Sequence, residues 1–503
     1  MTRERTDNRI LVGGSWLMAG QAVERVIGLV SIAILARLLT PTDFGIVAVA
    51  GTVVAMVELL SAFGFDWALV RHREPSTDYL NSAWTLRVLL GLLTFAALGL
   101  LGPVAAAFYR LPPLKTVLLA LGLSSFLASL ENVGTVYFRR EFAFHKEFLL
   151  RAVSKLAGFL VTVSVALNYR SYWALVAGIL AVRSSSTAAS YALHPYRPRP
   201  TLASARELFG FSSWLLIGNI VDYCRERFSD LYLGRVFGPR ANGLFSVAGE
   251  LSRMPITEVA TPINRVAYSK YSEDIRANRG VAGSYLEIAS FIWMISLPMC
   301  AGLIIVATEV VALLLGPRWE DAESVIRLLA LGAVFTVMTA NTHYVYWAVG
   351  HSRIVAGLSA VGAAIIVPVT IVCSHLAGYK GVALAYALTS AALVPVNFAL
   401  LRRLAGVGFA DLWYRVWRVT LAAIVMLVTL FFTMPQQGHE TASAAARVLL
   451  MKVALGVTTY VATAAALWLA CGRPDGPERR ALQLAQQRTQ RRTKAPAPDS
   501  EIP

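Results

Sequence analysis

The sequence is poor in the residues from which metal centres and disulfide frameworks are built. Its 503 residues include only four cysteines, which are far apart and form no CxxC pair: Cys224, Cys300, Cys373 and Cys471. This spacing predicts neither a zinc site nor a disulfide framework. The sequence contains no glycine-rich loop with the Walker lysine and no dinucleotide fingerprint, so we expect no nucleotide hydrolysis by this chain. We therefore predict no cofactor and no metal ligands.

Charged residues are also scarce, at 15% of the chain, whereas hydrophobic residues make up 56% and the mean hydropathy is +0.58. Apolar runs of about 20 residues recur from end to end, and each is long enough to cross a hydrocarbon core about 30 Å thick. The connections between them are too short for a soluble domain. The pattern predicts an all-α integral membrane protein with about fourteen transmembrane helices, at residues 11–36, 43–66, 80–109, 114–138, 147–168, 172–192, 207–234, 241–264, 282–308, 321–348, 354–376, 380–401, 411–433 and 443–471.

The basic residues lie mainly on one predicted side of the membrane. The formal net charge is +16, and 29 of the 46 lysines and arginines fall in alternate connections, starting with the N-terminal segment. Cytoplasmic loops carry such an excess, so both termini are predicted to be cytoplasmic. The same distribution argues against a nucleic-acid partner. The basic tail, residues 472–503, is expected to lie against anionic lipid of the bilayer.

The chain contains an internal repeat with a constant offset of 198 residues. The stretch LARLLTPTDFGIVAVA at residues 35–50 matches LGRVFGPRANGLFSVA at 233–248, and residues 15–50 share 12 identities with residues 213–248. We predict two parallel lobes of six helices each, related by a pseudo-two-fold axis along the membrane normal, which favours transport by rocking of the lobes. The predicted parts are a cytoplasmic leader (1–10), an N-lobe (11–192), a cytoplasmic linker (193–206), a C-lobe (207–401), an additional helix pair (411–471) and the basic cytoplasmic tail (472–503).

Proline and glycine recur at matching positions of the two repeats. Pro41 and Pro239 are expected to end the first helix of each lobe, because proline cannot continue a helix. Gly45 and Gly243 are expected to permit a tight turn into the next helix. The repeated motif is therefore predicted to be structural rather than part of a substrate site.

Five longer stretches, in a fixed order along the chain, resemble one transporter family. They are LARLLTPTDFGIVAVA, LLSAFGFDWALVRHRE, YFRREFAFHKEF, FGFSSWLLIGNIVDY and LLLGPRWEDAESVIRLLAL. Together they are similar to the polysaccharide-exporter branch of the MOP (multidrug, oligosaccharidyl-lipid, polysaccharide) superfamily, especially Wzx-type flippases of the colanic-acid-exporter kind. The resemblance implies two six-helix lobes around a central cavity in a bacterial inner membrane. It also implies movement of an undecaprenyl-pyrophosphate-linked glycan from the cytoplasmic to the periplasmic leaflet, with a polysaccharide polymerase and a chain-length regulator as partners.

Charged residues inside the apolar spans are the candidates for a substrate site. An ionised side chain in hydrocarbon costs at least a few kcal/mol, so such residues must be paired or must face a wet cavity. In the seventh span, five of them cover an arc of about 200°, too wide for a helix surrounded by lipid. The candidate substrate-binding residues are Glu24, Arg25, Arg87, Asp222, Arg225, Glu226, Arg227, Asp230 and Arg253.

Two interpretations of these charges are open at this stage. The arginines can offer paired donors to a pyrophosphate. Alternatively, the charges only pair with one another, Asp222 with Arg225 and Arg227 with Asp230.

Two other functions are also open: an ion-coupled multidrug or cation antiporter of the same superfamily, and a membrane polymerase or ligase acting on the lipid-linked sugar. The arginines of the seventh span argue against the first, and the short outer loops argue against the second. The sequence does not identify a coupling ion, H⁺ or Na⁺. Six acidic residues in or near the spans are candidates for binding one: Glu58, Glu131, Glu250, Glu258, Glu287 and Glu309.

Overall fold

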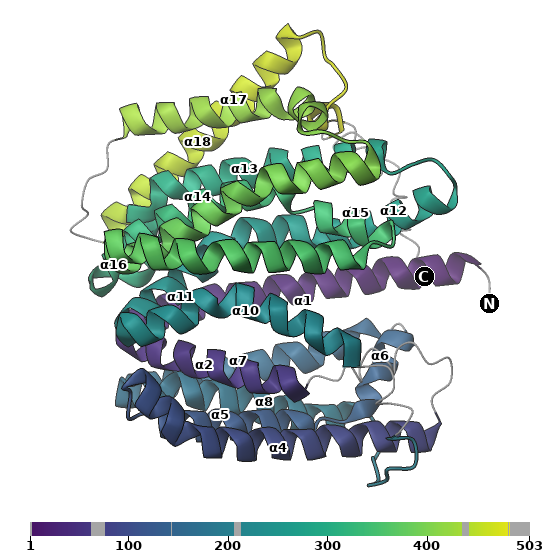
Figure 1. The fold of residues 1–503 in the computed structure, drawn as a ribbon, viewed down its shortest axis with the longest axis vertical. Coiled ribbons are helices and arrows are strands. Elements are labelled where there is room, and N and C mark those ends of the chain that lie inside the picture. The colour runs from purple at the N-terminus through teal and green to yellow at the C-terminus, as the bar shows by residue number, and fades with distance from the viewer. Residues whose placement is uncertain are drawn as a thin grey trace, which may run out of the picture. The chain divides into compact units, whose positions relative to one another are not determined.

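The computed structural model describes residues 3–61, 76–141, 143–205, 213–434, 442–480 and 482 (Figure 1). Every regular element among these residues is helical. The α-helices are α1 (Arg3–Leu38), α2 (Pro41–Ser61), α4 (Thr77–Tyr109), α5 (Leu114–Ser129), α6 (Val136–Arg140), α7 (Phe144–Tyr169), α8 (Trp173–Leu193), α10 (Ser213–Val236), α11 (Gly238–Pro255), α12 (Thr261–Arg276), α13 (Ala282–Val310), α14 (Ala322–Thr339), α15 (Thr342–Ala348), α16 (Ser352–Ala405), α17 (Phe409–Thr433) and α18 (Ala442–Ala470). Two π-helical segments, η2 (Ile256–Ala260) and η3 (Val311–Leu315), and two 3₁₀ segments, η1 (Val133–Thr135) and η4 (Pro317–Trp319), complete the described elements.

Eight helical stretches among the described residues are long and apolar enough to cross a membrane. They comprise α2, α4, α7, α13 with η3, α14 with α15, α16, α17 and α18. The predicted all-α, multi-pass membrane class is therefore confirmed. The number of fourteen spans is not confirmed, because α1, α8, α10 and α11 are not among the eight and α5 is shorter.

The predicted pair of spans at 354–376 and 380–401 corresponds to α16, which is interrupted at Ala377 and Gly378. Gly378 has φ +62°, outside the helical region. A Cβ placed on Gly381 would lie 1.9 Å from the carbonyl oxygen of Cys373. Residues eight apart on a straight helix are separated by about 12 Å, so the chain must fold back at this point.

Contacts divide the chain into two compact units, one comprising residues 1–247 and 311–322, the other 248–310 and 323–503. The boundary between the two units falls inside α11, whereas the predicted lobes meet at the linker, residues 193–206. The two divisions are different, and the predicted lobes stay a prediction. Parts of the second and seventh predicted spans lie outside the described residues. The same is true of the side chain of Asp222 and of the tail beyond residue 482.

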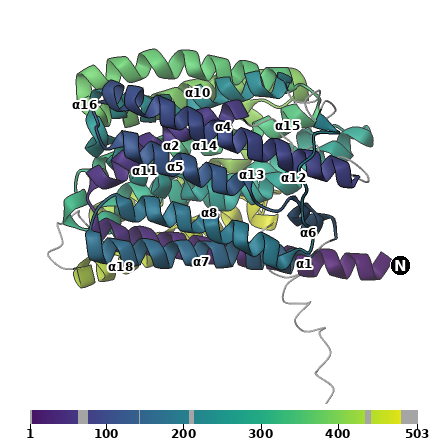
Figure 2. The same ribbon diagram turned by 90° about the horizontal axis from the view of Figure 1, so that it is seen from below.

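In the first unit, α7 packs along both α1 and α8, and α5 packs against α4 and α8 (Figure 2). Two glycines make the contact between α7 and α8 close. A methyl group on Gly158 would lie 2.2 Å from Val182, and one on Gly178 would lie 1.8 Å from the Thr162 hydroxyl. The helices can approach this closely only because both positions lack a side chain.

The turn between α1 and α2 differs from the prediction. Pro41 is the first residue of α2 rather than the end of α1, a position that suits proline because the missing amide would have no partner there. The Asp43 carboxylate accepts hydrogen bonds from the Thr40 amide at 2.9 Å and the Thr40 hydroxyl at 2.6 Å. Fully buried Trp319 donates its indole N–H to the carbonyl of Ala36 at 2.9 Å and fixes the end of α1.

The predicted turn role of Gly45 and Gly243 is wrong, because both residues lie inside helices, in α2 and α11 respectively. The two helices touch at these glycines. A Cβ on Gly45 would lie 1.7 Å from the carbonyl oxygen of Pro239, and one on Gly243 would lie 1.9 Å from that of Pro41. The two contacts are related by the 198-residue offset, so matching residues of the two repeats meet each other reciprocally.

In the second unit, α13 packs against α17 and α18 (Figure 1). The Lys452 ammonium of α18 lies 2.6 Å from the Glu309 carboxylate of α13, and both side chains are fully buried. The hydroxyl of Tyr460 donates to the carbonyl of Met294 at 2.7 Å. These two polar contacts fix α18 along α13.

The predicted linker is docked rather than free in water. Its residues run over the N-terminal end of α4, where the amide oxygen of Asn81 accepts hydrogen bonds from the Tyr196 hydroxyl at 2.6 Å and the Arg199 amide at 2.8 Å. Two further linker amides donate to hydroxyls of α4. The start of the predicted tail is docked as well, since Glu478 accepts two hydrogen bonds from the Arg418 guanidinium, at 3.0 and 3.3 Å.

Candidate substrate site

Charged residues of α1 and α7 form the first group of candidate site residues. The Glu24 carboxylate lies 4.0 Å from the guanidinium of Arg151, which also pairs with Glu147 at 2.7 Å. Arg25, next to Glu24, is partly buried. The structure therefore joins Glu24 to a cation of α7 that the sequence analysis did not select.

The second group lies on α10. The Arg225 guanidinium is 3.4 Å from Glu226, and the Arg227 guanidinium is 3.2 Å from Asp230. The pairing of Arg227 with Asp230, which belongs to one of the two open interpretations, is present in the structure. The pairing of Asp222 with Arg225 lies outside the described side chains. Arg225 and Arg227 keep 31% and 46% of their side chains uncovered by protein, while Asp230 keeps only 8%.

Helix α10 is held beside α2. The Tyr223 hydroxyl donates to the carbonyl of Thr52, and a Cβ on Gly234 would lie 2.7 Å from Val49. Tyr223 and Gly234 are three helical turns apart on α10, whereas Thr52 and Val49 are one turn apart on α2, so two separate points of α10 contact the same short stretch of α2. Arg225 and Arg227 lie between these two contact points along the chain.

The two remaining candidates lie elsewhere. Arg87 of α4 donates to the carbonyl of Ala128 on α5 at 3.5 Å. Arg253, in the part of α11 that belongs to the second unit, lies against Gly249 of its own helix. These contacts join the two arginines to neither of the groups above.

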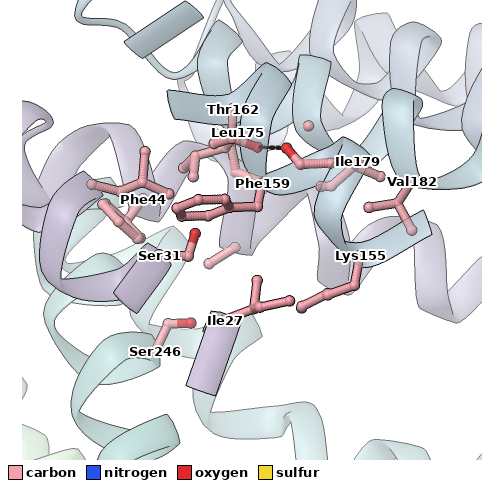
Figure 3. A pocket seen from close by; sticks show the side chains of 15 residues that line it. Ile27, Ser31, Phe44, Lys155, Phe159, Thr162, Leu175, Ile179, Val182 and Ser246 are labelled. Carbon is pink, nitrogen blue, oxygen red and sulfur yellow. Dashed lines mark hydrogen bonds between the residues drawn. The ribbon is translucent and has the colours of Figure 1, made fainter. Parts of the chain in front are cut away.

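A cavity of about 320 Å³ lies between α1, α2, α7 and α8, with Ser246 of α11 also lining it (Figure 3). Most of its 15 lining residues are apolar, and Lys155 of α7 is the only one with a charged side chain. None of the eight candidate residues whose side chains are described lines it. Lys155 was missed because a single lysine in an apolar span is ordinarily explained as a side chain that extends to the membrane surface.

Several of the acidic residues considered for ion binding have protein partners. Glu58 accepts a hydrogen bond from the Ser125 hydroxyl at 2.6 Å, and Glu287 lies 2.9 Å from the Arg480 guanidinium. Glu309 forms the buried pair with Lys452. These contacts favour structural roles for the three residues, and binding of a coupling ion stays a prediction.

Residues 34–324 match the sequence model of a family described as "Polysaccharide biosynthesis protein". The chain belongs to this family. The match covers more than half of the chain and includes α2 and α10, although Glu24 and Arg25 precede it. It confirms the resemblance to polysaccharide exporters.

Two curated relatives share the polysaccharide biosynthesis theme. "Lipopolysaccharide biosynthesis protein WzxC" of Escherichia coli is 25% identical over 337 residues, which is 65% of this chain and 67% of that protein. "Succinoglycan biosynthesis transport protein ExoT" of Rhizobium meliloti is 27% identical over 315 residues, which is 60% of this chain and 62% of that protein.

Two solved structures have a similar fold. The lipid II flippase MurJ, in an inward closed conformation, superposes with a TM-score of 0.74 at 13% identity, over 91% of this chain and 99% of that one. A multidrug resistance MATE family transporter of the MOP superfamily, in an inward-facing conformation, gives 0.56 at 15% identity, over 76% and 94%. The family model therefore assigns the chain to polysaccharide biosynthesis, and the two superpositions show that it shares the fold of membrane transporters.

Proposed function

We propose that this chain moves an undecaprenyl-pyrophosphate-linked oligosaccharide repeat unit from the cytoplasmic to the periplasmic leaflet of the bacterial inner membrane. The observation that carries this proposal is the polar face of α10. In a multi-pass membrane protein of a polysaccharide biosynthesis family, this helix holds Arg225 and Arg227 with a third to a half of each side chain uncovered. The fold, similar to that of a lipid II flippase, supports the same reaction class.

The chemistry of the proposed site is an exchange of anions. In the described state Arg225 lies beside Glu226 and Arg227 beside Asp230. A guanidinium binds phosphate oxygens with two parallel donors, and a pyrophosphate carries at least two negative charges. The pyrophosphate would therefore compete with the carboxylates for the arginines, and the carboxylates would take them back after release.

The proposed mechanism is alternating access by two similar halves. The 198-residue repeat supplies the similarity, and the reciprocal contact at Gly45 and Gly243 is one of the places where the two repeats touch. In this mechanism the contact closes the pathway on one side, and rocking of the halves opens it. A coupling ion, H⁺ or Na⁺, would drive the cycle, and a polymerase with its chain-length regulator would use the product.

The proposed orientation places both termini in the cytoplasm, as the distribution of basic residues predicts. Two exposed turn residues test it by single-cysteine labelling in a variant that lacks the four native cysteines: Arg110, between α4 and α5, and Asn278, between α12 and α13. A membrane-impermeant maleimide added to intact cells should label Arg110→Cys and not Asn278→Cys. The reverse pattern would overturn the orientation.

The transport proposal is tested with purified full-length protein in liposomes that contain fluorescent undecaprenyl-pyrophosphate-linked oligosaccharide. The protein should raise the rate at which the inner-leaflet label becomes accessible to an external quencher, and Arg225→Ala with Arg227→Ala should remove that increase. A rate equal to that of protein-free liposomes would contradict the proposal. Transport of an organic cation by the same liposomes would then favour the antiporter.

A further inference from the structure

The cavity between α1, α2, α7 and α8 has a polar end. Ile27 and Lys155 lie together there (Figure 3), one helical turn beyond the pair of Glu24 and Arg151. Lys155 is exposed, and among the described residues no carboxylate lies within ion-pair distance of it. The cavity therefore opens toward a cation that is available to an anionic ligand.

The other end of the cavity is apolar. Its walls there come from Leu35, Phe44 and Leu175, which belong to a buried cluster built around Leu39 and Ala166. This cluster adjoins that end of the cavity. A chain that enters at Lys155 would therefore end against a hydrophobic wall.

The cavity offers few hydrogen bonds, which excludes a sugar. The Thr162 hydroxyl already donates to the carbonyl of Gly158 at 2.6 Å (Figure 3). Ser31 and Ser246 are the two other lining hydroxyls. A monosaccharide has several hydroxyl groups, and burying them without partners would cost about 1–3 kcal/mol each.

The volume selects among apolar ligands. A cavity of about 320 Å³ lies at the small end of the range of about 300–1,000 Å³ that protein pockets for small molecules cover. An undecaprenyl chain is too long to be enclosed in a cavity of this size. A single medium-length alkyl chain fits.

From this geometry we infer that the cavity binds a medium-chain fatty acid anion, with its carboxylate on Lys155 and its alkyl chain directed toward Phe44. The inference rests on the cavity alone and is independent of the proposed transport reaction. Because Ser246 of α11 lines the cavity together with α1 and α2, a bound chain would contact all three helices. The site would thus let a free fatty acid stabilise this arrangement of the helices.

The test uses purified full-length protein in nanodiscs of zwitterionic lipid and a dodecanoate probe with a photoreactive group at the end of its chain. Illumination should label peptides of α1, α2 or α8, and unlabelled dodecanoate should compete at least about tenfold better than dodecanol, because a charge-assisted contact adds affinity. Lys155→Met should remove this difference and leave dodecanol binding unchanged. Lys115→Met, an exposed lysine of α5 that does not line the cavity, should behave as the unmodified protein.

A second variant tests the cavity itself. Ala48→Phe places a ring inside it and should abolish saturable labelling by the probe, while Lys155→Met keeps the apolar part of the site. Equal competition by dodecanoate and dodecanol in the unmodified protein would overturn the inference. So would labelling that is spread over helices that do not line the cavity.

Discussion

Gly45 of α2 and Gly243 of α11 lie backbone to backbone, and the amide nitrogen of Gly243 is 3.0 Å from the point where a Cβ on Gly45 would stand. The same relation holds in reverse, with the Gly45 amide nitrogen 2.8 Å from a Cβ on Gly243. Each glycine also faces the carbonyl of the other repeat's proline. A contact that the two repeats make on each other in the same way is what a pseudo-two-fold relation between them requires.

Replacing either glycine with alanine should destabilise the protein by about 1–3 kcal/mol, because the added methyl overlaps a backbone carbonyl that can move only with its helix. Gly45→Ala and Gly243→Ala should have similar effects. The control is Gly51→Ala on the same helix as Gly45, where nothing lies within 4 Å of the added Cβ. Thermal unfolding in detergent measures the three variants. Equal stability of Gly45→Ala and Gly51→Ala would show that the helices do not touch at this point.

The sequence revealed the repeat but not the contact between its two glycines. Apolar runs mark most helices, because the thickness of the hydrocarbon core sets the minimum length of a membrane-spanning helix. The 198-residue offset is visible from the identities between the two segments. The role of Gly45 was not predictable, because a glycine that permits a turn and a glycine that permits close helix packing look alike in one sequence. The two roles are distinguished only by the structure, in which the carbonyl of Pro239 lies against Gly45.

The candidate site was predictable where its contacts are local. Arg227 and Asp230 are three residues apart on one helix, so their pairing follows from helix geometry. The pairing of Glu24 with Arg151 joins residues more than 120 positions apart, and no periodicity in either helix reveals it. The cavity at Lys155 depends in the same way on how four helices pack, so the sequence pattern gave no signal for it.

The pair formed by Glu309 and Lys452 should be the most sensitive to loss of one member, because both side chains are fully buried. Glu309→Leu or Lys452→Met alone should cost about 3–5 kcal/mol, since each leaves a charge without its counterion. The double variant Glu309→Leu with Lys452→Met should recover most of that stability.

The matched control is the exposed pair of Arg240 and Asp321, whose members keep 63% and 47% of their side chains uncovered. Arg240→Ala should cost no more than about 1 kcal/mol. Protein yield and thermal unfolding measure all four variants. A double variant as unstable as either single variant would contradict this prediction. It would mean that the attraction between the two charges stabilises the contact of α13 with α18 more than apolar side chains can.

Acid should weaken the packing of α12 through Asp274. Hydrogen bonds from the Lys270 ammonium at 2.8 Å and from the Ser284 hydroxyl hold the pKa of Asp274 below its usual value. A carboxyl whose folded pKa is lowered contributes stability that is complete above its unfolded pKa of about 4 and is lost as the pH falls through the folded pKa. Asp274→Asn should therefore be less stable at pH 7 and lose less stability between pH 5 and pH 3. Thermal unfolding across this range checks it, with Asp321→Asn as control. Parallel curves for Asp274→Asn and the unmodified protein would contradict the assignment.

The function of Arg227 can be separated from its pairing with Asp230. If Arg227 holds the pyrophosphate during crossing, Arg227→Ala should lower export of the glycan by about tenfold or more while the protein stays folded in the membrane. Arg227→Lys should restore export only in part, because a point charge cannot reproduce a two-pronged contact.

Pairing alone predicts a different result for the same residues. The Asp230 side chain is only 8% exposed, so Arg227→Ala would leave a nearly buried carboxylate without this cation and would lower protein abundance. Arg227→Ala combined with Asp230→Ala would then restore abundance and export together. Under the ligand role the double variant regains abundance at most, because the donor that the pyrophosphate needs is still missing. Abundance in the membrane and export must therefore be scored side by side, and recovery of export in the double variant would refute the ligand role of Arg227.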